Sequence, residues 1–407
     1  MKFSSVRSVI TAAAFLMASG AILAQEINFT ASINAAQENP ATGSSATGFA
    51  DLEYNGEDNT FDLAITLNNF PNTITASHIH EGVAGVNGGA VNSLGDETVY
   101  TRSGDTLTLE VNDVPYSGDP AVLLAGGAYL NFHTAEFPSG EIRGQLIGES
   151  IKLYALMTPE QETASVTSDA YGAARINYNP SENKMEMLVF IYNFTNTLTG
   201  SHIHAAAVGQ DGGVVNSLGA AADYNNWGGT YSQYWDDVDF NGDPVALLSG
   251  GTYINVHSDV NAPGEIRGQI WMMDDEEEGP TRLVNVSSRG NVGLGDNAMI
   301  TGFVVTGRAP MLVLSTGRGP VLTDFGVAGA LADPQNTVFA NGVALASNDN
   351  FGDDPYAQFI SQQSFAPTVA AEAAVFVLLP PGAYTNVVSG VGDTTGVALA
   401  ESFEVEF

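Results

Sequence analysis

The sequence predicts an all-β protein: two tandem Greek-key sandwich or barrel repeats followed by a third β-sandwich domain. Three observations support this prediction: apolar residues alternate along short segments, 45 glycines punctuate the chain, and much of the sequence occurs twice. Between Phe61 and Leu67 every second residue is apolar, which is typical of a strand with one buried face. Glycine with Asn, Asp and Pro marks tight turns between such strands.

The internal repeat has an offset of 124 residues. The segment GGAVNSLG, which begins at Gly88, matches GGVVNSLG, which begins at Gly212, and GEIRGQ occurs in both copies. A repeat of this length indicates two copies of one domain. We therefore expect repeats at residues 25–149 and 150–273, each with the Greek-key connections of a sandwich or flattened barrel.

The segments outside the repeats have distinct compositions. Residues 1–24 combine a positively charged start with an apolar run that ends in Ala24, which indicates a secretory signal peptide. An uncleaved membrane anchor is the alternative, although the run is short for a bilayer span. We expect an exported protein, periplasmic, extracellular or on the cell surface, with no membrane insertion after cleavage. The acidic run 274–280 is expected to be a linker, and residues 281–407 the C-terminal β-sandwich.

The net charge excludes some classes of partner. The formal charge is −34 at pH 7, and a surface of this sign repels phosphate backbones, so we expect no nucleic-acid partner. The chain has no cysteine and therefore no disulfide. The sequence does not indicate a protein partner.

All six histidines of the chain fall into two triads of equal spacing. Each triad combines a Ser-His-Ile-His segment with a third histidine, 53 residues after the second histidine of that segment. Residues two apart on a strand point to the same face, so each segment presents two adjacent imidazoles. If the strand of the third histidine is its neighbour, three imidazoles converge on one ion. The expected metal ligands are His78, His80 and His133 in the first repeat and His202, His204 and His257 in the second.

Neutral imidazole is a ligand for copper and zinc, and we favour copper for these sites. Three protein ligands leave one coordination position open. The alternative is that these histidines are ordinary strand-surface residues of a structural or adhesive surface protein that binds no metal.

Several neighbours of the histidines are shared by both repeats and could orient a ligand. These candidates are Asn131, Asn255, Glu141, Glu265, Arg143 and Arg267. The simpler interpretation of the glutamate and arginine is a charge pair on one face of the GEIRGQ strand.

The third domain contains an acidic loop at residues 347–354. Its carboxylates Asp349, Asp353 and Asp354 are candidate calcium ligands, because calcium prefers oxygen donors. A plain turn is the alternative. The chain has no arrangement of nucleophile and base, because it lacks cysteine and its histidines belong to the triads.

The SHIHEG, NFH, NVH and GEIRGQ segments resemble the CHRD domain, a module named after chordin and found in secreted bacterial proteins. The resemblance covers both repeats and implies secreted β-sandwich modules. The third domain is similar, through its ASNDN and LPPGAYTNVVSG segments, to pre-peptidase C-terminal-type domains. That similarity implies an accessory or anchoring module.

The His-x-His pattern with a distant third histidine is also similar to the copper half of copper–zinc superoxide dismutases. A copper-dependent redox enzyme is therefore an alternative function. Those enzymes have a further bridging histidine, additional zinc ligands and a disulfide, whereas this chain has no spare histidine and no cysteine. We therefore favour binding over catalysis.

Overall fold

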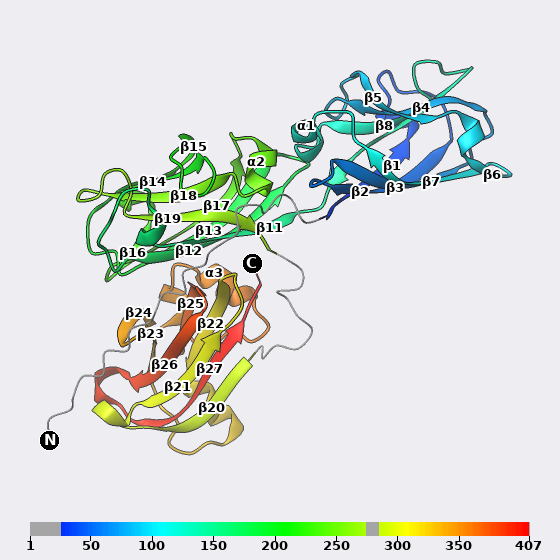
Figure 1. Cartoon of the computed structure of the whole chain (residues 1–407). Helices are drawn as coiled ribbons and strands as arrows, with labels where there is room; N and C mark the ends of the chain where they lie inside the picture. The colour runs from blue at the N-terminus through cyan, green and yellow to red at the C-terminus, as the bar shows by residue number, and fades with distance from the viewer. Residues whose placement is uncertain (1–25, 274–284, 407) are drawn as a thin grey trace.

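The computed structural model describes residues 26–273 and 285–406, and Figure 1 shows three β units along the chain. The expected signal peptide (1–24) and the expected linker (274–280) lie outside the described residues. The prediction of an all-β fold with two tandem repeats is confirmed, because each repeat forms a curled antiparallel sheet and the C-terminal region forms two further sheets.

The first repeat is one curled antiparallel sheet with the strand order β5-β4-β8-β9-β1-β2-β3-β7-β6, and β10 also pairs with β1. Its elements are β1 (Glu26–Asn34), η1 (Ala35–Gln37), β2 (Thr47–Asn55), β3 (Thr60–Asn68), β4 (Ile74–Glu81), β5 (Ala90–Gly95), η2 (Glu97–Val99), β6 (Thr101–Ser103), β7 (Thr106–Pro115), α1 (Pro120–Leu124), β8 (Ala128–Thr134), β9 (Ile142–Gln145) and β10 (Ile147–Gly148).

The second repeat has the equivalent strand order, β15-β14-β18-β19-β11-β12-β13-β17-β16. Its elements are β11 (Ile151–Met157), η3 (Pro159–Gln161), β12 (Tyr171–Asn179), β13 (Lys184–Tyr192), β14 (Leu198–Ala205), β15 (Gly213–Gly219), η4 (Ala221–Asp223), β16 (Asn225–Trp227), β17 (Thr230–Asp239), α2 (Pro244–Leu248), β18 (Thr252–Ser258) and β19 (Ile266–Met272).

Alternation along the strands builds the core of each repeat. In β3, Phe61, Leu63 and Ile65 are buried inside the curled sheet, whereas Thr66 is exposed on its outer face. Burial of such side chains contributes roughly 1.5–3 kcal/mol each. The core therefore lies between the two halves of the curl.

A short helix leads into β8, the strand that carries the third histidine. The Asp119 side chain accepts a hydrogen bond from the Ala121 amide at 3.0 Å, and Pro120 occupies the first helical turn. Both features favour helix initiation, since the aspartate satisfies a free amide and proline has none to satisfy. The end of this helix also contacts the second repeat, because the Tyr178 hydroxyl donates to the Leu124 carbonyl at 3.1 Å.

The C-terminal region is a sandwich of two four-stranded sheets, β20-β27-β22-β25 and β21-β26-β23-β24. Its elements are β20 (Asn285–Val292), η6 (Gly295–Asn297), β21 (Met299–Val305), β22 (Met311–Arg318), η7 (Pro320–Phe325), β23 (Pro334–Ala340), β24 (Val343–Asn348), η8 (Phe351–Asp353), α3 (Ala357–Gln362), β25 (Ala373–Leu379), β26 (Gly382–Gly390), η9 (Val391–Asp393) and β27 (Gly396–Glu404). Within residues 26–273 and 285–406, no helix has the length and apolar character needed to cross a membrane.

The third domain packs on the outer face of the second repeat. The ring of Phe190 on β13 lies 5.6 Å from that of Tyr356, and the Tyr192 hydroxyl donates to the Leu378 carbonyl at 2.8 Å. Residues 187–192 of β13 are consequently buried on both faces of the strand. This contact explains why β13 is a continuous apolar run, whereas β3, its counterpart in the first repeat, alternates.

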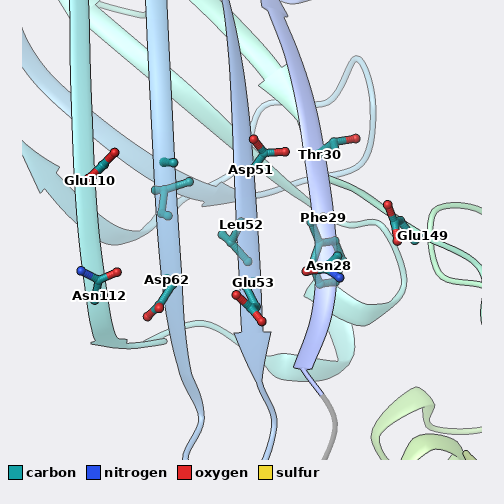
Figure 2. Close-up of a pocket in the computed structure, with 12 residues that line it drawn as sticks. Asn28, Phe29, Thr30, Asp51, Leu52, Glu53, Asp62, Glu110, Asn112 and Glu149 are labelled. Carbon is teal, nitrogen blue, oxygen red and sulfur yellow. The ribbon is translucent and has the colours of Figure 1, made fainter. Parts of the chain in front are cut away.

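The equivalent face of the first repeat is polar and acidic. Figure 2 shows Asp51, Glu53 and Asp62 along neighbouring strands of this face, around an open hollow. At the position of Phe190, the first repeat has the exposed residue Thr66. The two repeats therefore share their interiors and differ on this outer face.

Replacing Phe190 with Thr, the residue of the first repeat, tests this packing. Phe190 is 2% exposed, so its truncation is expected to lower the free energy of unfolding by about 3 kcal/mol. The control Thr66→Ala is expected to change it by less than about 0.5 kcal/mol. Urea denaturation measures both variants. Equal stability of Phe190→Thr and the wild type would contradict the packing.

Candidate metal centre

Antiparallel pairing of β4 with β8 brings the first histidine triad together. His78 lies across from Asn131, and His80 lies across from Tyr129. The ring centroids are 5.4 Å apart for His78 and His80, 5.1 Å for His78 and His133, and 5.8 Å for His80 and His133. One ring nitrogen of each histidine lies within 4.8 Å of the other two. The spacing seen in the sequence therefore corresponds to a compact group of three imidazoles.

Backbone carbonyls define which nitrogen is free in two of the three rings. His80 Nδ1 lies 3.0 Å from the Gly88 oxygen, and His133 Nδ1 lies 3.1 Å from the Pro138 oxygen. A carbonyl only accepts hydrogen bonds, so both Nδ1 atoms carry hydrogen and both Nε2 atoms keep a lone pair. These Nε2 atoms and His78 Nδ1 are buried without a hydrogen-bond partner. The triad thus offers three free lone pairs.

The second repeat reproduces this arrangement. His204 Nδ1 lies 3.0 Å from the Gly212 oxygen, and His257 Nδ1 lies 3.0 Å from the Ala262 oxygen. His202 Nδ1 and the Nε2 atoms of the other two histidines are again buried and unpaired. The ring centroids are 5.6 Å apart for His202 and His204, 5.0 Å for His202 and His257, and 5.9 Å for His204 and His257. The same set of donor atoms is therefore built twice.

The surroundings of the triads favour neutral imidazoles. Burial is the largest influence and lowers the pKa of each shifted histidine below 6.5, and the neighbouring imidazoles lower it further. The histidines with a lowered pKa are His78, His133, His202 and His257. A neutral ring is the form that binds a metal ion.

An aromatic stack supports His80 from one side. The Tyr129 ring lies 5.0 Å from the His80 ring at an interplanar angle of 18°, and the Arg143 guanidinium lies 3.3 Å from the centre of the Tyr129 ring. The Tyr129 hydroxyl accepts a hydrogen bond from the Gly88 amide at 3.1 Å. Gly88 therefore positions both rings, through its carbonyl and its amide. The second repeat has the same stack: the Tyr253 ring lies 5.0 Å from the His204 ring, and the Arg267 guanidinium lies 3.5 Å from the centre of the Tyr253 ring.

Sequence reasoning did not assign a role to the tyrosine or the glycine of this stack. The residues are Tyr129, Tyr253, Gly88 and Gly212. The sequence did hold a clue to them, because both the tyrosine and the glycine recur in the second repeat at the offset of 124 residues.

Arg143 acts on the site through the loop between β4 and β5. Arg143 is 1% exposed, and its guanidinium donates to the Val86 carbonyl at 2.9 Å and to the Val83 carbonyl at 3.0 Å. Gln145 donates to the Gly82 carbonyl of the same loop at 3.0 Å. These bonds fix the loop that presents the hydrogen-bond acceptor of His80. The equivalent arginine of the second repeat donates to the Ala207 carbonyl at 3.1 Å.

The expected charge pair between Glu141 and Arg143 is not among the contacts of the described residues. The Glu141 carboxylate accepts hydrogen bonds from Ser44 at 2.7 Å, Asn72 at 2.9 Å and Thr134 at 2.8 Å. Its oxygens are thereby directed to three other segments, while the guanidinium lies against the loop. The second glutamate, Glu265, likewise accepts hydrogen bonds from Ser168, Asn196 and Asn261.

The candidate calcium loop does not bring its three carboxylates together. Among the described residues, the two histidine triads are the only groups of three or more His, Asp or Glu donors within 4.8 Å of one another. Asp354 accepts a hydrogen bond from the Tyr356 amide at 2.8 Å, and burial raises its pKa to about 6. Asp354 thus stabilises a turn, and Asp349 and Asp353 do not join it in a three-carboxylate group.

The fold and the two triads define a tandem β-sandwich protein with one three-histidine centre in each repeat. The chain belongs to the CHRD domain family, whose model matches residues 29–146 and 153–270. The two matched segments contain all six histidines.

Comparisons with whole proteins add little. No curated protein matches the chain. Among solved structures, exo-beta-1,3-galactanase from Phanerochaete chrysosporium with galactose has 9% identity and a TM-score of 0.16, over 92% of this chain and 95% of that chain. A second structure of that galactanase, with beta-1,3-galactotriose, has 8% identity, the same coverage and the same TM-score. These scores are too low to indicate a common fold.

Replacing Gly88 with Ala tests the loop that orients His80. An added Cβ would overlap the carbonyl oxygen of Glu81, so the loop must move and His80 loses its acceptor. We expect a loss of roughly 1–3 kcal/mol in the free energy of unfolding and a shifted imidazole resonance of His80 by NMR. The control Gly89→Ala enters open space and is expected to resemble the wild type. Wild-type stability and resonances in Gly88→Ala would refute this role.

Proposed function

We propose that this protein binds one transition-metal ion in each repeat through its three histidines. The observation that carries the proposal is the convergence of three buried, unpaired imidazole nitrogens, found twice with the same choice of ring atom. A buried polar atom without a partner costs about 1–3 kcal/mol. A bound ion would offset this cost at all six nitrogens.

Copper is the favoured ion, and zinc is the alternative. All donors are neutral imidazoles, which suit both ions, and copper(II) binds nitrogen donors more tightly than the other divalent first-row metals. The backbone bonds to Nδ1 hold two rings of each triad before the ion arrives. Because only three protein ligands are present, a copper-dependent redox activity is a second candidate, tested by superoxide turnover above that of free copper.

Other parts of the chain bear on where the protein acts and on what its third domain does. We propose export, to the periplasm or the outside, on the basis of residues 1–24. The role would be metal binding or extracellular interaction, with no nucleic-acid partner because of the charge of −34. We also propose that the third sandwich, similar to pre-peptidase C-terminal-type domains, is an accessory module carried on the second repeat.

Metal loading of the purified protein tests the proposal. We expect two copper or zinc ions per chain, one ion in either His80→Ala or His204→Ala, and none in the double variant. Loss of one of three ligands should weaken a site by more than the roughly 10–100-fold typical of losing a residue that only orients a ligand. Thr75→Ala, an exposed change on the same strand as His80, is the control and should keep both ions. Absence of bound metal, or unchanged loading of the double variant, would exclude the site.

The pH dependence of binding follows from the lowered histidine pKa values. A base whose folded-state pKa lies below its unfolded value of 6.5 favours folding when neutral, and that stability is lost as the pH falls below 6.5. Protons compete with the metal in the same range. We therefore expect constant affinity from alkaline pH down to about 6.5, and a steep decline at lower pH. Isothermal titration at several pH values measures this, and affinity that rises on acidification would contradict imidazole ligation.

A further inference from the structure

Each repeat contains a buried carboxyl oxygen that the metal site does not use. Glu38 follows η1, and Glu162 follows η3, at equivalent positions of the repeats. Their Oε1 atoms are buried and have no hydrogen-bond partner. The same holds for the Oδ1 atoms of Asn131 and Asn255 on the histidine-bearing strands β8 and β18.

The unpaired oxygens of each repeat face the same point. A Cβ added at Gly140 would lie within 2.5 Å of both Asn131 Oδ1 and Glu38 Oε1, so both oxygens face one point and are no more than about 5 Å apart. A Cβ at Gly264 would collide with the corresponding pair in the second repeat. Two buried acceptors that face one point repel each other, and a hydrogen on one of them removes this repulsion.

Rotation of the asparagine amide does not supply that hydrogen. Asn255 Nδ2 donates to the Pro263 carbonyl at 3.3 Å. A flipped amide would place Oδ1 against this carbonyl, and so would exchange one pair of facing acceptors for another. In the second repeat we therefore assign the hydrogen between the two oxygens to the carboxyl group of Glu162. We extend this assignment to Glu38, because the same two oxygen atoms are unpaired in the first repeat.

The charges around these glutamates are consistent with a retained proton. Burial raises the pKa of both Glu38 and Glu162 to about 7, against the opposing influence of Arg143 on β9 or its counterpart. The loop between β4 and β5 has no ionisable side chain, and β8 contributes His133 and Tyr129.

Around Glu162, two charged groups are close. Arg267 lowers its pKa and Asp211 raises it, and these two side chains lie 3.7 Å apart.

We propose that Glu38 and Glu162 are neutral carboxylic acids in the folded protein, each donating its proton to the Oδ1 atom of Asn131 or Asn255. Asn131 lies across from His78 and two residues before His133. If the triads bind metal as proposed above, the two acids are positioning residues. Each of them holds, through its asparagine, the strand that carries the third histidine of its triad.

Infrared difference spectroscopy of the metal-free protein tests the protonation directly. Below pH 7, the wild type minus Glu38→Gln/Glu162→Gln should show the C=O band of a carboxylic acid, and this band should give way to a carboxylate band above about 7. Glu160→Gln, at an exposed neighbour, is the control and should not remove the acid band. A carboxylate band alone below pH 7 would overturn the proposal. If the double variant does not fold, each single variant, Glu38→Gln or Glu162→Gln, should remove part of the acid band, and an unchanged band in both would overturn the proposal.

Stability gives a second readout. An acid with a raised folded-state pKa stabilises the fold fully below its unfolded value of 4.5, and this contribution is lost as the pH rises through about 7. The wild type should therefore lose stability over that interval relative to Glu38→Gln/Glu162→Gln, whose amides can donate to the asparagines at any pH. Parallel stability profiles would overturn the proposal.

Metal affinity separates the positioning role from the proton assignment. Glu38→Gln should keep the affinity of the first site, because its amide can still donate to Asn131, whereas Glu38→Ala should weaken it by about 10–100-fold. Equal affinities of the two variants would refute positioning. Failure of the wild type to bind metal would refute the proposed function and leave the infrared result intact.

Discussion

The register between β4 and β8 determines the geometry of the histidine centre. Side chains on a strand alternate between faces, so a slip of one residue would turn the imidazoles into the core and expose the residue between them. Ile79 is that residue, and it is fully buried. The core thus holds the register through apolar burial, and the histidines take their positions as a consequence.

Around this pairing, the protein buries an unusually polar layer on one face of the sheet. The Arg143 side chain is enclosed, yet it finds carbonyl acceptors in the loop and an aromatic face in Tyr129. Bonds of this kind offset the desolvation of a buried cation. Within the described residues, one nitrogen of each imidazole of the triad lacks such a partner, as do Asn131 Oδ1 and Glu38 Oε1, so the polar layer is not fully satisfied by its own hydrogen bonds.

Local patterns were sufficient to predict the strands and the two triads. Alternation of period two gave β3, and the fixed spacing of His78, His80 and His133 gave the convergence of the rings. These features depend on one strand or on one strand pair. The role of Gly88 was not predicted, because it depends on how a loop folds back over β4.

The prediction of a charge pair between Glu141 and Arg143 on the GEIRGQ strand was wrong for a related physical reason. Two residues on one face of a strand are near each other, but nearness does not decide which partner each finds. Glu141 is drawn to three hydroxyl and amide donors, and Arg143 to loop carbonyls. Likewise, the apolar run of β13 could not be attributed to the third domain until the packing of Phe190 and Tyr192 was visible.

The difference between the outer faces of the repeats shows that contact with the third domain is independent of the histidine triads. The histidine centre occupies β4, β8 and β9, whereas attachment of the third domain depends on the outer side of β13. Residues such as Thr66 and Phe190 distinguish an exposed outer face from a covered one, whereas the histidine triads of the two repeats are the same. The triad and the attachment surface thus lie on separate parts of one sheet, so a residue change at one of them can leave the other intact.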